Sequence, residues 1–355
     1  MTKEGIEKLP TLLDVINNQL AKEHRREIKI DNSEHIEELT NYFQSNYFTP
    51  IPDNEGICEL FPNKTDFHSY FRGENRYHEQ CFPSLFRNGM QEADIFVERL
   101  KRCEMKLMMK EYPMTPMIEN GIIAVDPSGE QHRLKIKIGY DGLAQHYGIK
   151  TEYFDFTSDI LTAAFFAATT YDSEKDIYSP ITDIEINQFG AFYVYNENPF
   201  SVHGKDRRLD VVGLQPLARP GCQSAYAFKM KKGENLNNIA KKILFRHDSK
   251  VNEMIFNITN KSNRLFPQEI LNDKIRKGIV NGKNFSKKAF DEARNLYYPN
   301  VDEEVLDGYI KKKNIKIEPQ QQQWFSDSEK NDIISYWKCH EQDFLRQIVP
   351  VWVKR

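Results

Sequence analysis

Several features that would assign this sequence to a common class of protein are missing. Its five cysteines are widely spread, with no Cys-x-x-Cys pair, so neither a disulfide framework nor a zinc site is indicated. No window approaches eighteen uninterrupted apolar residues. The N-terminal stretch is broken by acidic residues, Pro10 and Asn17, so it lacks the apolar core of a secretion signal. These absences predict a soluble protein of the reducing cytoplasm, with no membrane partner.

The signature motifs of frequent enzyme classes are also absent. The sequence has no G-x-G-x-x-G, G-x-x-x-x-G-K-[ST], H-E-x-x-H or G-x-S-x-G, so a standard dinucleotide fold, a P-loop, a zincin and an α/β-hydrolase are unsupported. Nine histidines lack metal-ligand spacing, and no metal is predicted. Because 49 basic and 52 acidic residues nearly cancel, any nucleic acid would have to bind a local basic patch.

What remains is the composition of a globular protein with a large core. Of the 355 residues, 39% are hydrophobic and 28% are charged. Between residues 57 and 280, short β-like runs such as SYFRGE, GAFYVYNEN, SAYAFKM and EMIFNI alternate with helical stretches. We therefore predict an α+β fold, with a mixed or antiparallel sheet core packed by helices.

Helical patterns flank this middle region on both sides. Residues 1–56 contain two amphipathic patterns, PTLLDVINNQLAKEHRR and NSEHIEELTNYFQSNYF. Residues 281–355 are lysine-rich and helical, interrupted by the run EPQQQQ. The predicted division is a helical N-terminal extension (1–56), a central domain (57–280) and a helical C-terminal extension (281–355).

The densest group of polar residues begins in the run LAQHYGIK. Asp141 can cap a short helix there, and Gly148 can end it, because glycine adopts the left-handed conformation without a side-chain penalty. His146 then lies in the last turn of the helix. In that place it is either a site residue or a surface histidine stabilised by the helix dipole.

The next residues, KTEYFDFTSDILTAAFFAAT, are typical of a strand that enters a buried helix. Alternation places Asp155 and Thr157 on the face opposite two core phenylalanines. Thr157 or Ser158 would cap the helix, with Asp159 in its first turn. The first helix amides would then be open to a phosphate or carboxylate. The alternative is that these polar side chains only cap the helix and satisfy buried amides.

A second group of residues lies in SYFRGE and FPSLFR. Arg72 is expected on the strand face opposite Phe71, and Gly73 lets a ligand or another backbone approach. Arg87 follows in a turn. A guanidinium binds two anionic oxygens at once, so arginine beside glycine at a strand end suits a diphosphate.

Four runs in order, YFRGE…FPSLFR, LAQHYGIKTEYFDFT…AAFFA, LARPGCQSAYAF and RLFPQEI, resemble the FRG domain family, named after its Phe-Arg-Gly motif. The resemblance covers roughly residues 60–275. The sequence departs from the family's usual residues at Lys150, Glu152 and Phe156. The family's pattern falls on Phe71, Arg72, Gly73, Pro83, Ser84, Leu85, Arg87, Gln145, His146, Gly148, Thr151, Asp155, Thr157, Arg219, Gln223 and Pro267.

A weaker resemblance links these elements to mono-ADP-ribosyltransferases, which hold NAD in a split β-sandwich. It implies that Arg72 grips the NAD phosphates and that Thr157 and Ser158 position the nicotinamide ribose. His146 or Asp155 would order the pocket. Such enzymes supply a glutamate on a later strand.

The resemblance thus implies NAD as a substrate and no metal. Where the glutamate is expected this sequence offers Gln223 with Arg219, and Glu253 and Asp155 are the possible substitutes. The predicted catalytic residues are His146, Asp155 and Gln223. The predicted ligand-binding residues are Arg72, Gly73, Arg87, Gln145, Thr157, Ser158 and Arg219. The alternative is a buried network in which Arg72, Arg219 and Gln223 hold three strands together.

Three functions therefore stay open. The first is an NAD-consuming enzyme of a toxin or antiphage (bacterial defence) type, with a protein or nucleic-acid acceptor. The second is a nucleotide or nucleic-acid binding module without turnover, for which the basic runs at 229–250 and 309–317 are candidates, although such runs are usually solvated helix faces. The third is a protein-interaction scaffold that presents its terminal helices.

Overall fold

The computed structural model describes residues 2–22, 48–62, 69–87, 89–125, 129–184, 188–196, 208–213, 217–345 and 348. The second predicted N-terminal helix, residues 32–48, lies outside this part of the chain except for Phe48, which begins a strand. Within the described residues, no helix is long and apolar enough to cross a membrane.

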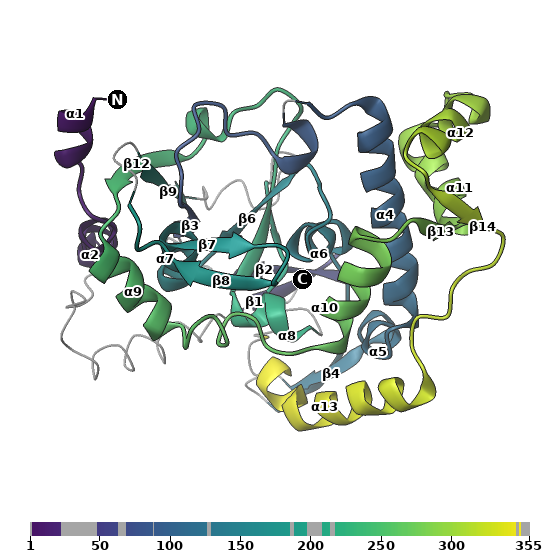
Figure 1. The fold of residues 1–355 in the computed structure, drawn as a ribbon. Helices are drawn as coiled ribbons and strands as arrows, with labels where there is room; N and C mark the ends of the chain where they lie inside the picture. The colour runs from purple at the N-terminus through teal and green to yellow at the C-terminus, as the bar shows by residue number, and fades with distance from the viewer. Residues whose placement is uncertain are drawn as a thin grey trace.

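A six-stranded antiparallel sheet forms the centre of the molecule (Figure 1). In spatial order its strands are β10 (Leu209–Val211), β11 (Ala225–Lys229), β6 (Tyr153–Thr157), β3 (Ser69–Glu74), β9 (Phe189–Asn196) and β12 (Lys241–Arg246). The predicted strands SYFRGE, GAFYVYNEN and SAYAFKM correspond to β3, β9 and β11. Short β-like runs in the sequence were therefore sufficient to locate these three strands.

Three smaller sheets complete the β structure. A mixed four-stranded sheet contains β1 (Phe48–Pro52), β2 (Ile57–Pro62), β5 (Gln131–Ile136) and β4 (Ile122–Val125). Two pairs are formed by β7 (Thr169–Asp172) with β8 (Ile177–Pro180), and by β13 (Asn284–Ser286) with β14 (Lys316–Glu318). The fold is α+β with mixed and antiparallel sheets, as predicted.

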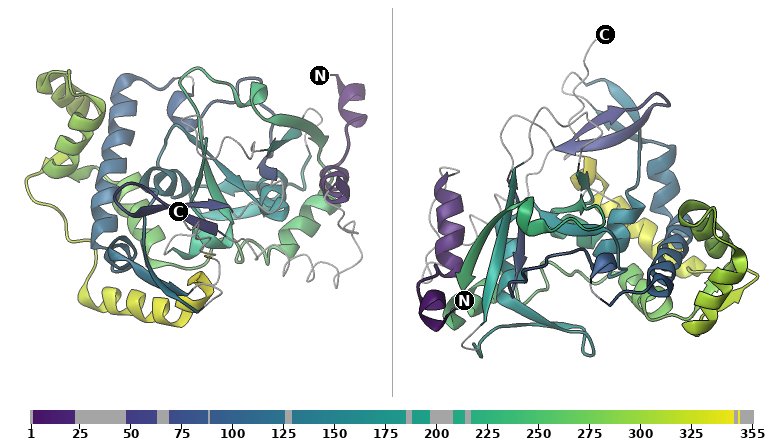
Figure 2. Two further views of the ribbon diagram at one scale, coloured as in Figure 1. Left: turned by 180° about the vertical axis from the view of Figure 1, so that it is seen from behind. Right: turned by 90° about the horizontal axis from the view of Figure 1, so that it is seen from above.

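Helices surround the sheets on several sides (Figures 1 and 2). The α-helices are α1 (Lys3–Glu7), α2 (Leu12–Lys22), α4 (Glu92–Glu111), α5 (Met114–Asn120), α6 (Tyr140–His146), α7 (Ile160–Ala168), α8 (Ala218–Cys222), α9 (Ser249–Ile258), α10 (Ile270–Lys274), α11 (Lys287–Tyr297), α12 (Glu303–Lys312) and α13 (Asp327–Leu345). The run FPSLFR forms the 3₁₀-helix η1 (Ser84–Phe86), and η2 (Leu236–Asn238) is a second one. The π-helix η3 (Ile275–Val280) directly continues α10.

Helix α7 packs closely on β3. A Cβ atom at Gly73 would lie 1.9 Å from the carbonyl oxygen of Ala163, so only glycine allows this approach. The sequence left open whether Gly73 admits a ligand or a backbone, and the structure places the α7 backbone there. In this packing Phe165 is fully buried, whereas Phe166 is only partly buried. The opposite face of the sheet, including Phe154 and Phe156, packs into a separate and larger core cluster.

The start of α7 differs from the prediction. Asp159 is the N-cap, and its carboxylate accepts hydrogen bonds from the Leu161 amide (3.0 Å) and the Thr162 hydroxyl (2.6 Å). The predicted caps, Thr157 and Ser158, lie two residues and one residue too early. Because the chain supplies its own anion at this helix terminus, the first amides are not an open site for a ligand.

The run EMIFNI was predicted as a strand and is part of helix α9. Asp248 caps this helix, accepting from the Lys250 and Val251 amides. Val251 and Ile255 then bury one helical face against α7. The run EMIFNI does not include Val251, so it does not show this helical spacing of four residues. Glu253 points away from that face and is exposed. The basic run 229–250 spans the end of β11, η2, strand β12 and the start of α9, so it is not one helix face.

Both terminal segments pack against the central domain. Leu12, Val15, Ile16 and Leu20 of α2 are buried in the cluster around α7. At the other end, α11 and α12 pack on α4. The predicted boundary at 56/57 falls in the turn between the paired strands β1 and β2. The division into three domains stays a prediction.

Candidate functional site

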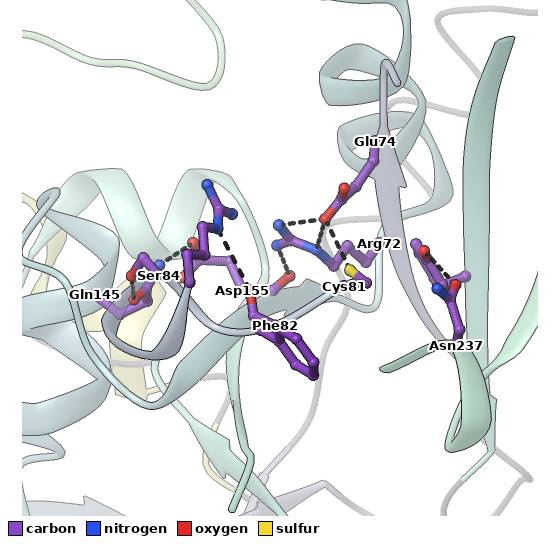
Figure 3. Close-up of polar contacts among 10 residues, drawn as sticks. Arg72, Glu74, Cys81, Phe82, Ser84, Gln145, Asp155 and Asn237 are labelled. Atoms are coloured by element: carbon purple, nitrogen blue, oxygen red, sulfur yellow. Dashed lines mark hydrogen bonds and ion pairs between the residues drawn. The ribbon is translucent and has the colours of Figure 1, made fainter. Parts of the chain in front are cut away.

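The central sheet opens between β3 and β6. These strands pair at one position, Phe71 with Thr157, and then separate. The Arg72 side chain crosses this gap, and its Nη1 donates to the Asp155 carbonyl oxygen at 2.9 Å (Figure 3). The arginine thereby joins two strands where the backbone ladder has ended.

Arg72 is largely committed to partners within the protein. Its Nε donates to Glu74 Oε1 at 3.0 Å, and Nη2 lies 2.9 Å from the same oxygen (Figure 3). The guanidinium also lies over the Phe154 ring, 4.6 Å from its centroid. Burial alone would lower the pKa of Arg72, but the charges of Glu74, Cys81 and Asp155 and the hydrogen bond to Glu74 together raise it. The Arg72 and Glu74 side chains are 18% and 12% exposed.

Beside this opening lies a cleft of about 2100 Å³. It is bounded by the central sheet, α7, the β7–β8 hairpin, the segment from residue 261 to η3, and residues 322–324 before α13. Nine of the ten predicted site residues line it: Arg72, Gly73, Arg87, Gln145, His146, Asp155, Thr157, Arg219 and Gln223. Ser158 is not among the residues that line it. The structure thus brings together residues spread over 150 positions of the chain, and their roles remain predictions.

His146 and Asp155 form a pair in the wall of the cleft. His146 Nδ1 lies 3.5 Å from Asp155 Oδ1, and His146 is 6% exposed. Its Nε2 is buried and has no hydrogen-bond partner among the described residues. Burial lowers the pKa of His146, against the opposing effect of Asp155. A neutral imidazole of this kind, with Nδ1–H directed at a carboxylate, leaves the Nε2 lone pair free to accept a proton.

Asp155 is held as a carboxylate by its neighbours. Burial alone would raise its pKa, but His146, the charge of Arg72 and the Gln145 amide together lower it. Gln145 Nε2 donates to Asp155 Oδ2 at 3.3 Å. The Gln145 side-chain oxygen Oε1 accepts from the Thr151 hydroxyl at 2.7 Å, which fixes the orientation of the side-chain amide. The predicted site residue Gln145 therefore positions Asp155.

Thr157 and Gln223 are hydrogen-bonded within the protein. The Thr157 hydroxyl donates to the Gln223 carbonyl oxygen at 2.7 Å and accepts from the Asp159 amide at 2.9 Å. Gln223 Nε2 donates to the Leu265 carbonyl oxygen at 2.9 Å. These bonds tie β6, the end of α8 and the segment before α10 together. They favour the structural role for Thr157 that the sequence had left open.

Arg219 occupies the middle of the cleft wall. Its Nη1 donates to Asn272 Oδ1 at 2.8 Å, and its guanidinium lies over the rings of Tyr147 and Phe266. Its Nε is buried without a hydrogen-bond partner in the described part of the chain. Arg72, Arg219 and Gln223 therefore each bond to different partners, and the expected three-residue network is replaced by separate contacts.

Sequence reasoning missed Glu269. This glutamate lines the cleft and accepts a hydrogen bond from the Tyr147 hydroxyl. Burial raises its pKa, partly offset by Tyr147 and by the charge of Arg219. Glu269 belongs to the run RLFPQEI, in which only the proline was taken as part of the family's pattern. The suggested substitute Glu253 lies on the exposed face of α9 and does not line the cleft.

At the rim of the cleft Arg87 is exposed, and its Nε lies 3.4 Å from the Phe82 carbonyl oxygen. Glu152, at a position where the FRG family commonly has arginine, pairs with Arg102 at 2.9 Å. Among the described residues, no group of three or more histidine, cysteine, aspartate or glutamate side chains is arranged to hold a metal ion.

Comparison with known proteins assigns part of this region to a family. Residues 68–176 match the family model of the FRG domain. The match contains Arg72, Gln145, His146 and Asp155, while Arg219, Gln223 and Glu269 lie beyond it. No curated protein and no solved structure matches the chain.

Proposed function

We propose, from the premise that residues 68–176 form an FRG domain, that the cleft binds NAD and breaks its bond between nicotinamide and ribose. The observation that carries this proposal is His146. Its imidazole is buried in the cleft wall, held by Asp155 on one side, with an unpartnered Nε2. An unpaired nitrogen at such a site costs free energy unless a ligand or a reacting group uses it.

The chemistry assigned to these residues is a displacement at the ribose carbon. The carbon–nitrogen bond breaks, and nicotinamide leaves as a neutral molecule with the bonding electron pair. A water or acceptor hydroxyl forms the new bond to the ribose carbon and gives its proton to His146 Nε2. Asp155 stabilises the imidazolium that results. Water yields ADP-ribose, and a protein or nucleic-acid acceptor yields an ADP-ribosylated product.

The ribosyl group carries positive charge as nicotinamide departs. Asp155, whose pKa is lowered, is the carboxylate of the cleft wall that offsets this charge, and Glu269 adds to it in its ionised form, which the ribosyl charge and Arg219 favour. Gln223 has no charge to offer, and its amide nitrogen already donates to Leu265. In this proposal Glu269 takes the electrostatic role for which the sequence offered Gln223. An enzyme that removes cellular NAD would act as a toxin or antiphage effector.

Nicotinamide release tests the proposal directly. The full chain is incubated with NAD and the products are separated by chromatography, with and without protein or nucleic-acid acceptors. We expect turnover in the wild type and a loss of about 100-fold or more in kcat for His146→Gln. His340→Gln, at an exposed histidine of α13, is the matched control and is expected to keep full activity. Intact NAD under every condition, with the protein folded, would overturn the proposal.

A second candidate function is favoured by Arg72. The Arg72 guanidinium already donates to Glu74 and to the Asp155 carbonyl oxygen. A phosphate would therefore have to compete with Glu74 for it. This arrangement favours a module that binds a nucleotide without turnover. It predicts saturable NAD binding with unchanged NAD, a steep salt dependence and no effect of His146→Gln on affinity beyond about twofold.

A further inference from the structure

The β7–β8 hairpin gives one wall of the cleft an aromatic surface. Tyr171 and Tyr178 are direct partners across the hairpin, with ring centroids 4.9 Å apart. Tyr178 in turn stacks on Phe266, at 4.7 Å and an interplanar angle of 24°. All three residues line the cleft, and Tyr171 is 46% exposed. We call Tyr171, Tyr178 and Phe266 the aromatic platform.

The exposed ring of the platform is held in place from its hydroxyl end. The Tyr171 hydroxyl donates to Asp176 Oδ1 at 2.6 Å. Asp176 forms an ion pair with Arg276 of η3, and Arg276 Nη2 also donates to the Ser173 carbonyl oxygen at 3.3 Å. The hairpin extends outward from the main sheet (Figure 2, right), so this contact is what joins its tip to η3. The platform therefore loses little freedom when a ligand stacks on it.

We infer that the aromatic platform binds a purine base, the adenine of the dinucleotide in the proposed function. A flat ring that is half exposed in a cleft and fixed in position offers its face to another planar group, and stacking of this kind is independent of base sequence. The platform could in principle accept either ring of NAD. Charge decides between them.

The nicotinamide ring of NAD is positively charged and adenine is neutral. The Arg219 guanidinium already lies 4.9 Å from the centroid of Phe266, at the inner end of the platform. Arg276 stands at the hairpin tip beside its outer end. Because Asp176 neutralises Arg276, the deciding cation is Arg219, which disfavours a positively charged ring on the platform and suits a base that carries a phosphate. The nicotinamide end is then directed to the carboxylates Asp155 and Glu269.

Binding of adenosine monophosphate to the full chain, measured by isothermal titration calorimetry, tests this assignment. Ribose 5-phosphate is the probe that lacks the base. We expect Tyr171→Ala to weaken adenosine monophosphate binding about 5- to 100-fold. Tyr171→Phe keeps the ring and is expected to stay within about threefold of the wild type. Tyr336→Ala, at a tyrosine of α13 that is 53% exposed and does not line the cleft, is the matched control.

Three results would overturn the platform assignment. These are an absence of adenosine monophosphate binding by the wild type, an unchanged affinity in Tyr171→Ala, and an equal loss for ribose 5-phosphate. The placing of the nicotinamide end rests on the proposed function. Failure of the platform and failure of the proposed function can nevertheless be distinguished. Base binding that depends on Tyr171 with no NAD turnover supports the platform and removes the enzyme. NAD turnover with an unchanged KM in Tyr171→Ala removes the platform alone.

Discussion

His146 and Asp155 meet across the cleft wall, with 3.5 Å between Nδ1 and Oδ1, although they belong to different elements. His146 ends helix α6, and Asp155 is the central residue of strand β6. Between them Gly148, at a φ of +88°, turns the chain back on itself. A local turn thus builds the pair, and the surrounding core buries it.

Protonation of His146 is expected to destabilise the protein. Its folded-state pKa lies below the unfolded value of about 6.5, so the unfolded chain binds the proton more tightly. The free energy of unfolding should fall as the pH drops below about 6.5, by up to about 1.4 kcal/mol per pH unit. Urea denaturation of the wild type and His146→Gln at pH 7.5 and pH 5.5 measures this.

The histidine substitution should make that pH dependence shallower. Part of the slope will remain, because His247 is also buried, with a pKa lowered by burial. His340→Gln, at an exposed histidine of α13, is the matched control. Equal slopes for the wild type and His146→Gln would contradict the buried neutral imidazole.

Gly73→Ala is expected to be strongly destabilising. The added methyl group would lie 1.9 Å from the carbonyl oxygen of Ala163, which is backbone of a buried helix and cannot easily move. We expect a loss of about 2–4 kcal/mol in the free energy of unfolding. Gly308→Ala in α12 is the control, because nothing lies within 4 Å of its Cβ position, and should stabilise by about 0.5–1 kcal/mol. A neutral Gly73→Ala would show that α7 does not lie this close to β3.

The Arg72–Glu74 ion pair should couple more strongly than a more exposed pair. Replacing Arg72 with alanine leaves Glu74 without its cation and Phe154 uncovered, at a cost of about 1–3 kcal/mol. A double-mutant cycle with Glu74→Ala measures the coupling free energy. The reference cycle is Arg208 with Glu234, whose side chains are 25% and 24% exposed. A smaller coupling for Arg72–Glu74 would leave the guanidinium available to a ligand.

Thr157→Val tests whether this hydroxyl serves the fold. The valine would leave the Asp159 amide and the Gln223 carbonyl without their partner, and we expect a loss of about 1–3 kcal/mol. Thr157→Ser keeps the hydroxyl and should recover most of that loss. Thermal and urea denaturation compare the two variants. A valine variant as stable as the serine variant would return Thr157 to the set of ligand-binding candidates.

The sequence predicted local elements well where one pattern was strong. The short β-like runs SYFRGE and GAFYVYNEN located β3 and β9, and the apolar run ILTAAFFAA located α7. It failed at EMIFNI, because a short apolar run fits strand and helix equally and the Asp248 cap lies outside it. The helix cap at Asp159 was misplaced because several capping residues are adjacent, and only their hydrogen bonds distinguish them.

The candidate site was predicted in part for a related reason. Residue types placed Arg72, His146 and Asp155 among the candidates, and the fold brings all three to one cleft. Glu269 and the aromatic platform were missed, because their importance comes from distant neighbours such as Tyr147 and Arg276.

By itself the amino-acid sequence determined most of the segments that become strands and helices, EMIFNI excepted, since periodicity and glycine positions act over a few residues. Only the tertiary structure decided which polar groups remain available. Arg72 forms an ion pair with Glu74, Asp159 caps the start of α7, and the Thr157 hydroxyl donates to the Gln223 carbonyl oxygen. His146 Nε2, in contrast, has no hydrogen-bond partner in the described residues. The physical reason is that a hydrogen bond is satisfied by geometry in space, which the folded backbone sets both for near neighbours such as Arg72 and Glu74 and for Thr157 and Gln223, which are 66 residues apart.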